Sequence, residues 1–194
     1  MKTKTSLFLS VLVSYILILP VAEAHTFGAE GVGLVAGFVH PFMGLDHLLA
    51  MIAVGIWAWQ LGGRAVWFVP VTFVSMMSIA ATFGLSGFSL PIIEPAIACS
   101  LLILGLLVAG SVRLPLITSV CLVGLFAIFH GYAHGLELPQ TASPALYGIG
   151  FILATALLHG LGIGFAHSSR QYKIIQRIAG CSLIVASGLL LAAT

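Results

Sequence analysis

The chain has 194 residues, of which 60% are hydrophobic and 6% are charged, and its formal net charge at pH 7 is +2. A soluble domain carries about 25% charged residues, so this composition excludes one and predicts an integral membrane protein in a lipid bilayer. The lysines and arginines are spread thinly between apolar runs, which gives no sign of a nucleic-acid-binding surface. The three cysteines lie in apolar runs without a C-x-x-C pair and imply no disulfide framework.

Residues 1–24 have the pattern of a secretory signal peptide, the first of two predicted domains. Two lysines precede an apolar run, and Ala22-Glu23-Ala24 is an A-x-A-type cleavage site. Cleavage there would make His25 the first residue of the mature chain, where its amine and imidazole could chelate a metal ion together. An uncleaved first span is the alternative.

Residues 25–194 form the second predicted domain, an all-α polytopic bundle of about six transmembrane helices. Each segment is near the roughly 20 residues that a spanning helix needs. The first is longer and contains Pro41, which donates no backbone hydrogen bond and disfavours helical geometry at His40, so a break is expected there. The segments are Glu30–Gln60, Ala65–Leu85, Pro91–Ala109, Leu114–Ala133, Pro144–His167 and Ile174–Ala193.

Positive charges between these segments fall on one side of the predicted bundle. Arg64 follows the first segment, Arg113 the third and Arg170 the fifth. The positive-inside rule then places these loops in the cytoplasm and both mature termini outside, in a bacterial cytoplasmic membrane. Glu94 and Glu137 fall near the opposite, outer ends, where carboxylates raise the local concentration of cations.

Residues 38–51 carry His40, Asp46 and His47 within an apolar run. Ionisable groups are costly in hydrocarbon, so they normally face a cavity, a partner or a cargo. Two imidazoles and a carboxylate are also ligands that first-row divalent metals accept. Met51 follows His47 by four residues on the same helical stripe and is a weaker candidate ligand.

Residues 129–137 repeat this chemistry. His130 and His134 are four residues apart, and His134 and Glu137 are three apart, so all three can face one direction on a helix. His159, in the fifth segment, is a further candidate ligand nearer the cytoplasm. The order of depth expected from outside is Glu137 and His134, then His130, His40, Asp46 and His47, and then His159, with His167 at the inner end of the fifth segment.

The run H-P-x-x-G-x-D-H-x-x-x-M at residues 40–51 resembles the signature of the HupE/UreJ family. These are small hydrogenase- and urease-accessory membrane proteins regarded as nickel, and sometimes cobalt, permeases. The block F-H-G-x-A-H-G-x-E at residues 129–137 reinforces the resemblance, which covers the whole mature chain. Its implied metal ligands are His40, Asp46, His47, His130, His134 and Glu137.

The resemblance implies secondary transport of Ni²⁺ or Co²⁺ for hydrogenase or urease maturation, without enzyme activity and without a resident cofactor. Metallochaperones are candidate partners, and the oligomeric state stays open. No G-x-x-x-x-G-K-[ST] loop is present, so the sequence predicts no ATPase within this chain.

Two other functions remain open at this point. Residues 84–87, Gly-Leu-Ser-Gly, match the G-x-S-G string of rhomboid-type intramembrane proteases, with Ser86 as nucleophile and His159 as candidate base. A haem-binding electron carrier would hold haem between His40 or His47 and His130, although the chain has no C-x-x-C-H attachment motif.

Overall fold

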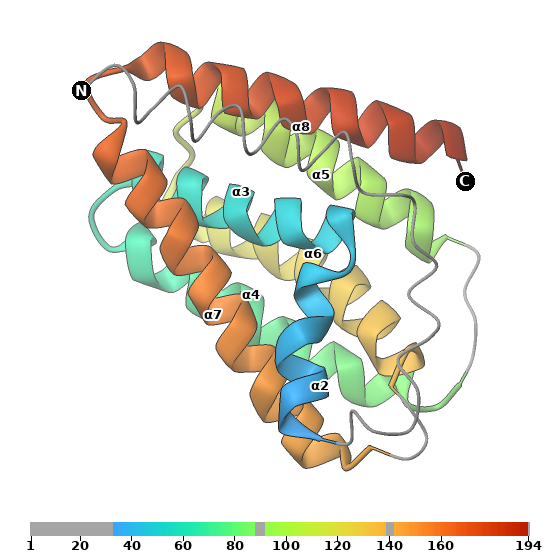
Figure 1. Ribbon diagram of the computed structural model, residues 1–194. Coiled ribbons are helices and arrows are strands. Elements are labelled where there is room, and N and C mark those ends of the chain that lie inside the picture. Colours follow the sequence, from blue (N-terminus) through green and yellow to red (C-terminus); the bar gives the residue numbers. More distant parts are fainter. Residues whose placement is uncertain (1–32, 88–91, 139–141, 194) are drawn as a thin grey trace.

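The computed structural model describes residues 33–87, 92–138 and 142–193, and these ranges fold as helices joined by short connections (Figure 1). The predicted signal peptide, its cleavage site and His25 lie outside the described residues. The helices are α2 (Leu34–Val39), the 3-10 helix η1 (His40–Phe42), α3 (Leu45–Leu61), α4 (Ala65–Gly84), α5 (Ile93–Gly110), α6 (Leu116–Leu136), α7 (Pro144–Ser168) and α8 (Lys173–Ala193).

The five helices from α4 to α8 are each long and apolar enough to cross a membrane, and the bent pair α2–η1 with α3 makes up to six spans. The outer faces are strongly apolar: Trp67, Phe83 and Leu189 are 72%, 64% and 68% exposed. Exposed apolar surface on this scale is costly in water and is matched by lipid. The predicted polytopic helical bundle is therefore confirmed.

The first span is broken where the sequence predicted it. The helix pair Leu34–Phe42 and Leu45–Leu61 bends by 83°. Pro41 lies at the start of η1, and Gly44 precedes α3 with an extended backbone (φ −92°, ψ 118°). Irregular backbone at membrane depth is tolerated where it is buried in protein or lines a cavity. The bend therefore brings the start of α3, with Asp46 and His47, into the bundle.

Four pairs of helices within the described residues cross with their backbones in direct contact, because glycine stands at each crossing. A Cβ atom at these glycines would overlap the backbone of the partner helix. They are Gly84, Gly131 and Gly135 where α4 meets α6, Gly37, Gly55, Gly150 and Gly162 where α2 and α3 meet α7, and Gly180 where α8 meets the end of α5.

We expect Gly131→Ala to destabilise the protein, because the added Cβ would overlap the carbonyl oxygen of Met77. Overpacking of this kind costs about 1–3 kcal/mol. Gly148→Ala is the matched control, since a Cβ there meets no atom within 4 Å. Thermal unfolding of the purified variants in detergent measures the difference. Equal melting temperatures for the two variants would contradict the close crossing of α4 and α6.

The loops that carry arginine share one end of the bundle. Gln60, near the end of α3, donates hydrogen bonds to the carbonyl oxygen of Val108 in α5 and to Gln176 in α8, at 3.1 and 3.0 Å. The connections after α3, α5 and α7 therefore lie together, and those after α4 and α6 lie at the other end (Figure 1). This arrangement matches the one-sided distribution of positive charge.

Candidate metal centre

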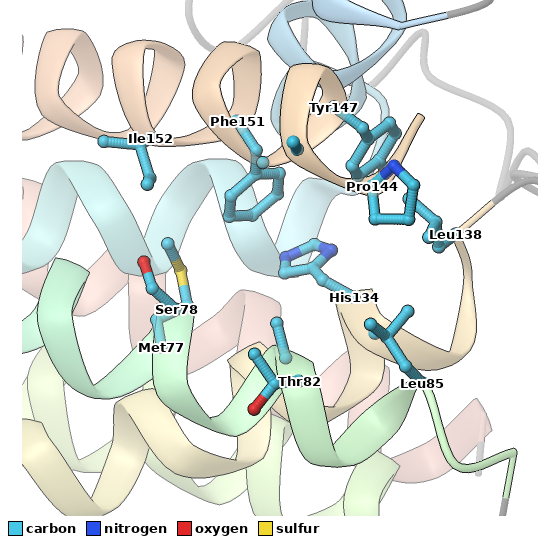
Figure 2. Close-up of a pocket in the computed structure, with 14 residues that line it drawn as sticks. Met77, Ser78, Thr82, Leu85, His134, Leu138, Pro144, Tyr147, Phe151 and Ile152 are labelled. Carbon is cyan, nitrogen blue, oxygen red and sulfur yellow. The ribbon is translucent and has the colours of Figure 1, made fainter. Parts of the chain in front are cut away.

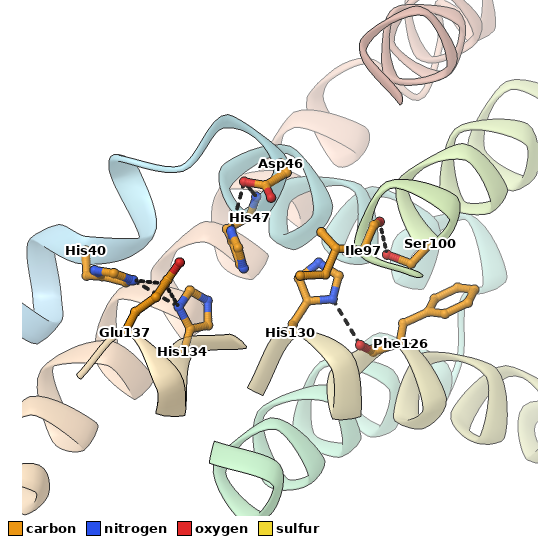
Figure 3. A network of polar contacts seen from close by, with 9 residues as sticks. All are labelled: His40, Asp46, His47, Ile97, Ser100, Phe126, His130, His134 and Glu137. Atoms are coloured by element: carbon orange, nitrogen blue, oxygen red, sulfur yellow. Dashed lines mark hydrogen bonds and ion pairs between the residues drawn. The ribbon is translucent and has the colours of Figure 1, made fainter. Parts of the chain in front are cut away.

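Three side chains from two distant parts of the chain meet where η1 approaches the end of α6 (Figure 3). The Nε2 atom of His40 lies 2.9 Å from Oε2 of Glu137 and 3.0 Å from Nδ1 of His134, and the last two atoms are 3.4 Å apart. Side-chain ligand atoms within 4.8 Å of one another can hold a single metal ion. His40 precedes His134 by 94 residues, so only folding brings the two motifs together.

The two shorter contacts are hydrogen bonds as they stand, and all three distances also fit a first-row divalent metal ion. With metal–ligand bonds of about 2.1 Å, neighbouring ligand atoms lie about 3.0 Å apart at right angles and about 3.4 Å apart in a tetrahedron. The three observed distances are 2.9, 3.0 and 3.4 Å. Two imidazole nitrogens with one carboxylate oxygen suit nickel, cobalt or zinc better than magnesium or calcium, which prefer oxygen ligands.

Glu137 supplies the negative charge of this group. It follows α6 directly, beyond the spanning part of that helix, and its side chain is 36% exposed. Burial raises the pKa of the Glu137 carboxyl, but hydrogen bonds with His134 and His40 outweigh this effect and hold the pKa well below its usual value. The carboxylate is therefore charged at neutral pH and available to a cation.

Asp46 and His47 form a second unit at the start of α3. Oδ1 of Asp46 accepts hydrogen bonds from the backbone N–H and from the Nδ1–H of His47, both at 2.8 Å. With Nδ1–H held by the carboxylate, Nε2 of His47 carries the lone pair that can bind a metal ion. That Nε2 atom is buried and has no hydrogen-bond partner. Asp46 thus orients His47, and direct binding of an ion by Asp46 stays a prediction.

His130 repeats this arrangement in α6, where its side chain is fully buried. Its Nδ1–H donates to the backbone carbonyl oxygen of Phe126 at 3.0 Å, and its Nε2 has no partner. Nε2 of His134 is also buried and unpaired. An unpaired buried polar atom costs about 1–3 kcal/mol. Three unpaired nitrogens on neighbouring imidazoles indicate that these side chains bind a ligand.

The rings follow one another in a row (Figure 3). The ring centroid of His47 lies 4.1 Å from that of His134 and 5.2 Å from that of His130. His40 stands at the Glu137 end of the row, and His130 lies beyond His47. His40 therefore lies beside His134 and Glu137 and not beyond His130, as the sequence order had it, because the bend after Pro41 carries His40 back toward the end of α6.

The two weaker candidates lie further along the bundle. His159 is buried in α7 beside Phe73, with ring centroids 5.3 Å apart. Met51 is fully buried in the hydrophobic core, one turn after His47, where it contributes to packing. The ligand roles of His159 and Met51 stay predictions, as does that of His25.

Two aromatic side chains of α7 cover the cluster, and no sequence motif pointed to them. The ring centroid of Phe151 lies 4.2 Å from that of His134, and that of Tyr147 lies 5.7 Å from that of His40. The two residues are four apart and share one face of the helix. Aromatic residues at helical spacing are common in membrane helices, so their spacing alone carries no signal.

A cavity of about 300 Å³ lies between α4, α6 and α7, with His134 in its wall (Figure 2). At about 30 Å³ per water, an ion with six waters fills about 180 Å³, so size does not exclude it. Most of the wall is apolar, however, and the hydroxyls of Ser78 and Thr82 donate to carbonyl oxygens of their own helix. The cavity gives His134 room to move but offers an ion few ligands.

We expect Asp46→Asn to weaken Ni²⁺ binding by about 10- to 100-fold, the usual effect of losing the group that orients a ligating histidine. The neutral amide no longer strengthens the basicity of His47. Equilibrium dialysis of the purified protein measures the dissociation constant, and its melting temperature without metal serves as the control. A changed melting temperature with unchanged binding would assign Asp46 a purely structural role.

The fold and this site define a class of protein: a polytopic helical membrane protein with histidines and carboxylates gathered inside its bundle. The sequence profile of the family described as HupE / UreJ protein matches residues 13–191. Protein HupE from Rhizobium leguminosarum bv. viciae is 46% identical over 173 residues, which cover 88% of this chain and 90% of that protein. The chain belongs to the HupE/UreJ family, as its two motifs indicated. No solved structure was found to match it.

Proposed function

We propose that this protein is a secondary permease that carries Ni²⁺, or Co²⁺, into the cell for hydrogenase or urease maturation. The observation that carries the proposal is the meeting of His40 with His134 and Glu137 at distances suited to one divalent ion. The three residues come from the two motifs that resemble the signature of the family. The same ligand chemistry serves both metals, so the competition experiment below distinguishes them.

In this proposal Glu137, His134 and His40 capture the hydrated ion at the outer end of the bundle. The unpaired Nε2 atoms of His47 and His130 then replace further waters, and the contacts between the rings support this order. Because these further ligands are neutral imidazoles, they hold the ion without adding charge, and Asp46 contributes through its hydrogen bond with His47. Modest affinity is what a carrier needs.

The membrane potential supplies the driving force. One elementary charge gains about 2.3 kcal/mol for each 100 mV, so a divalent ion gains about 4.6 kcal/mol, enough for an accumulation of about three orders of magnitude. We propose the cytoplasmic membrane as the location, with the arginine-bearing loops inside and both mature termini outside. Metallochaperones in the cytoplasm would receive the metal.

The other two functions are less well supported. Ser86 is exposed in the turn after α4, whereas both ring nitrogens of His159 are buried without a hydrogen-bond partner, so the two do not form a catalytic pair. The rings of His47 and His130 are in edge contact at 5.2 Å, which leaves no space for a porphyrin between these two. Nε2 of His40, the other candidate ligand of haem, contacts His134 and Glu137 instead. Membership of the HupE/UreJ family also favours a transporter over an enzyme.

The test is uptake of radioactive ⁶³Ni²⁺ by cells that lack other nickel importers, with and without this protein. Uptake that depends on the protein, falls when an uncoupler collapses the membrane potential and is reduced by excess Ni²⁺ supports the proposal. Excess Co²⁺ and Zn²⁺ in parallel assays rank the metals. Protein-dependent binding without accumulation inside the cell would overturn transport as the function.

A further inference from the structure

His159 lies in the middle of α7, outside the group of residues described above. Only 2% of the residue is exposed, and neither Nδ1 nor Nε2 has a hydrogen-bond partner. A neutral imidazole has one donor and one acceptor, so both are left unpaired, at about 1–3 kcal/mol each. Leucine would fill this core position at lower cost. A histidine here therefore favours a ligand that binds it.

Phe73 of α4 packs between the rings of His159 and His130. His130 belongs to the outer cluster, the name used here for His40, His47, His130, His134 and Glu137. The fully buried ring of Phe73 lies 5.6 Å from the ring of His130 and 5.3 Å from the ring of His159, steeply inclined to both at 62° and 88°. On α7, His159 follows Phe151, which packs on His134, by eight residues, or about 12 Å along the helix. His159 is thus deeper in the bundle, toward the end with the arginine-bearing loops.

The backbone at His159 is held firmly against α3. A Cβ atom at Gly55 would overlap the carbonyl oxygen of His159, and one at Gly162 would overlap that of Ile52. This close crossing fixes α7 at the level of His159, and the ring contact with Phe73 gives the direction of its imidazole. The side chain therefore stands on a rigid support and faces the ring that divides it from His130.

We propose that His159 is a second, inner binding site for the divalent cargo ion, divided from the outer cluster by the ring of Phe73. One nitrogen of His159 replaces one water of the ion, and the ring of Phe73 must turn aside for the ion to pass. Neither nitrogen of His159 bonds to a carboxylate, so this site is weaker than the one that contains Glu137. This inference rests on the proposed transport function.

The first test is ⁶³Ni²⁺ uptake by His159→Leu, with His167→Leu as the matched control on the same helix. His167 is exposed and packs against Trp59, with ring centroids 4.8 Å apart, away from the cluster. We expect the maximal rate of His159→Leu to fall about 10-fold, with KM within about twofold of the wild type, because capture at the outer cluster is intact. Wild-type kinetics in His159→Leu would overturn the proposal.

The second test is binding of Ni²⁺ alone to the purified full chain in detergent. The wild type should show a tight phase from the site that contains Glu137 and a weak phase, and His159→Leu should keep the tight phase and lose the weak one. A weak phase that survives His159→Leu would overturn the inner site. If His159→Leu is poorly produced, a His159→Cys variant takes its place. This variant is made in a chain whose three native cysteines have been replaced by serine. This variant should bind Cd²⁺ at least 10-fold more tightly than His159→Ser, and equal Cd²⁺ binding by the two would overturn the proposal.

The two proposals fail in different ways. If the wild type takes up the ion and His159→Leu does so equally well, the inner site is refuted and the permease function is not. If the wild-type protein neither binds nor accumulates the ion, the proposed transport function is refuted, and the inner site is refuted with it.

Discussion

Replacing Glu137 with glutamine should reduce the initial rate of Ni²⁺ uptake, at concentrations below KM, by about 100-fold. Loss of groups that only orient ligands costs about 10- to 100-fold in metal affinity, and Glu137 is the charged member of the outer group itself. The amide keeps the size of the side chain, so the loss reports the charge. Uptake of ⁶³Ni²⁺ in whole cells, corrected for the amount of protein in the membrane, is the measurement.

Glu137→Asp is the control, because it keeps the charge on a shorter side chain, and it should retain more uptake than the glutamine variant. His40→Ala combined with Glu137→Gln tests whether the motifs share a site. Their atoms are 2.9 Å apart, so the two losses should depart from additivity by about 0.5–3 kcal/mol. Additive losses, or an equal loss in the aspartate and glutamine variants, would argue against one shared ion site.

His130→Asn should reduce uptake by about 10- to 100-fold while leaving the fold intact. The asparagine amide can occupy the place of Nδ1 and still donate to the carbonyl oxygen of Phe126, but it has no atom in the place of Nε2. His130→Gln makes the opposite change, since its amide reaches the position of the unpaired Nε2 and should restore part of the uptake. Uptake and thermal stability are measured on the same preparations.

The pair of variants separates binding from packing at His130. If packing alone matters, the longer and less well matched glutamine is the worse substitute, and the asparagine variant transports normally. His167→Asn serves as the reference for a histidine replaced outside the cluster. Normal uptake by His130→Asn would remove His130 from the path.

The helices could be predicted from the sequence because lipid leaves few alternatives to a helix for an apolar run of about 20 residues. The largest difference at the end of a predicted span is at α6, which continues past Ala133 to Leu136. The break at Pro41 was predictable for a similar reason, since proline removes a backbone donor. Its angle of 83° was not, because it depends on how α2 and η1 pack against α7.

The candidate site could be predicted only in part. Residue type and the cost of burying charge pointed to His40, Asp46 and His47 and to the motif of α6, but not to which atoms meet. The contact of His40 with Glu137 depends on the bend and on the crossing of helices far apart in the chain. The hydrogen bonds from His47 to Asp46 depend on local geometry at the start of α3. Neither contact has a period or a spacing that could be read from sequence.

The glycine crossings relate the two halves of the chain to each other. If the bent pair α2–α3 is counted as one span, the first half of the bundle ends with α5 and the second half begins with α6. Matching the helices of the two halves in order pairs α3 with α6, α4 with α7 and α5 with α8. Under this matching, the crossing of α3 with α7 corresponds to the crossing of α6 with α4. The crossing of α5 with α8 corresponds to itself, because these two helices are each other's counterparts. Halves of three spans run through the membrane in opposite directions, so the pairing is that of an inverted repeat. In transporters built this way, rocking of one half against the other exposes a fixed central site first to one side of the membrane and then to the other.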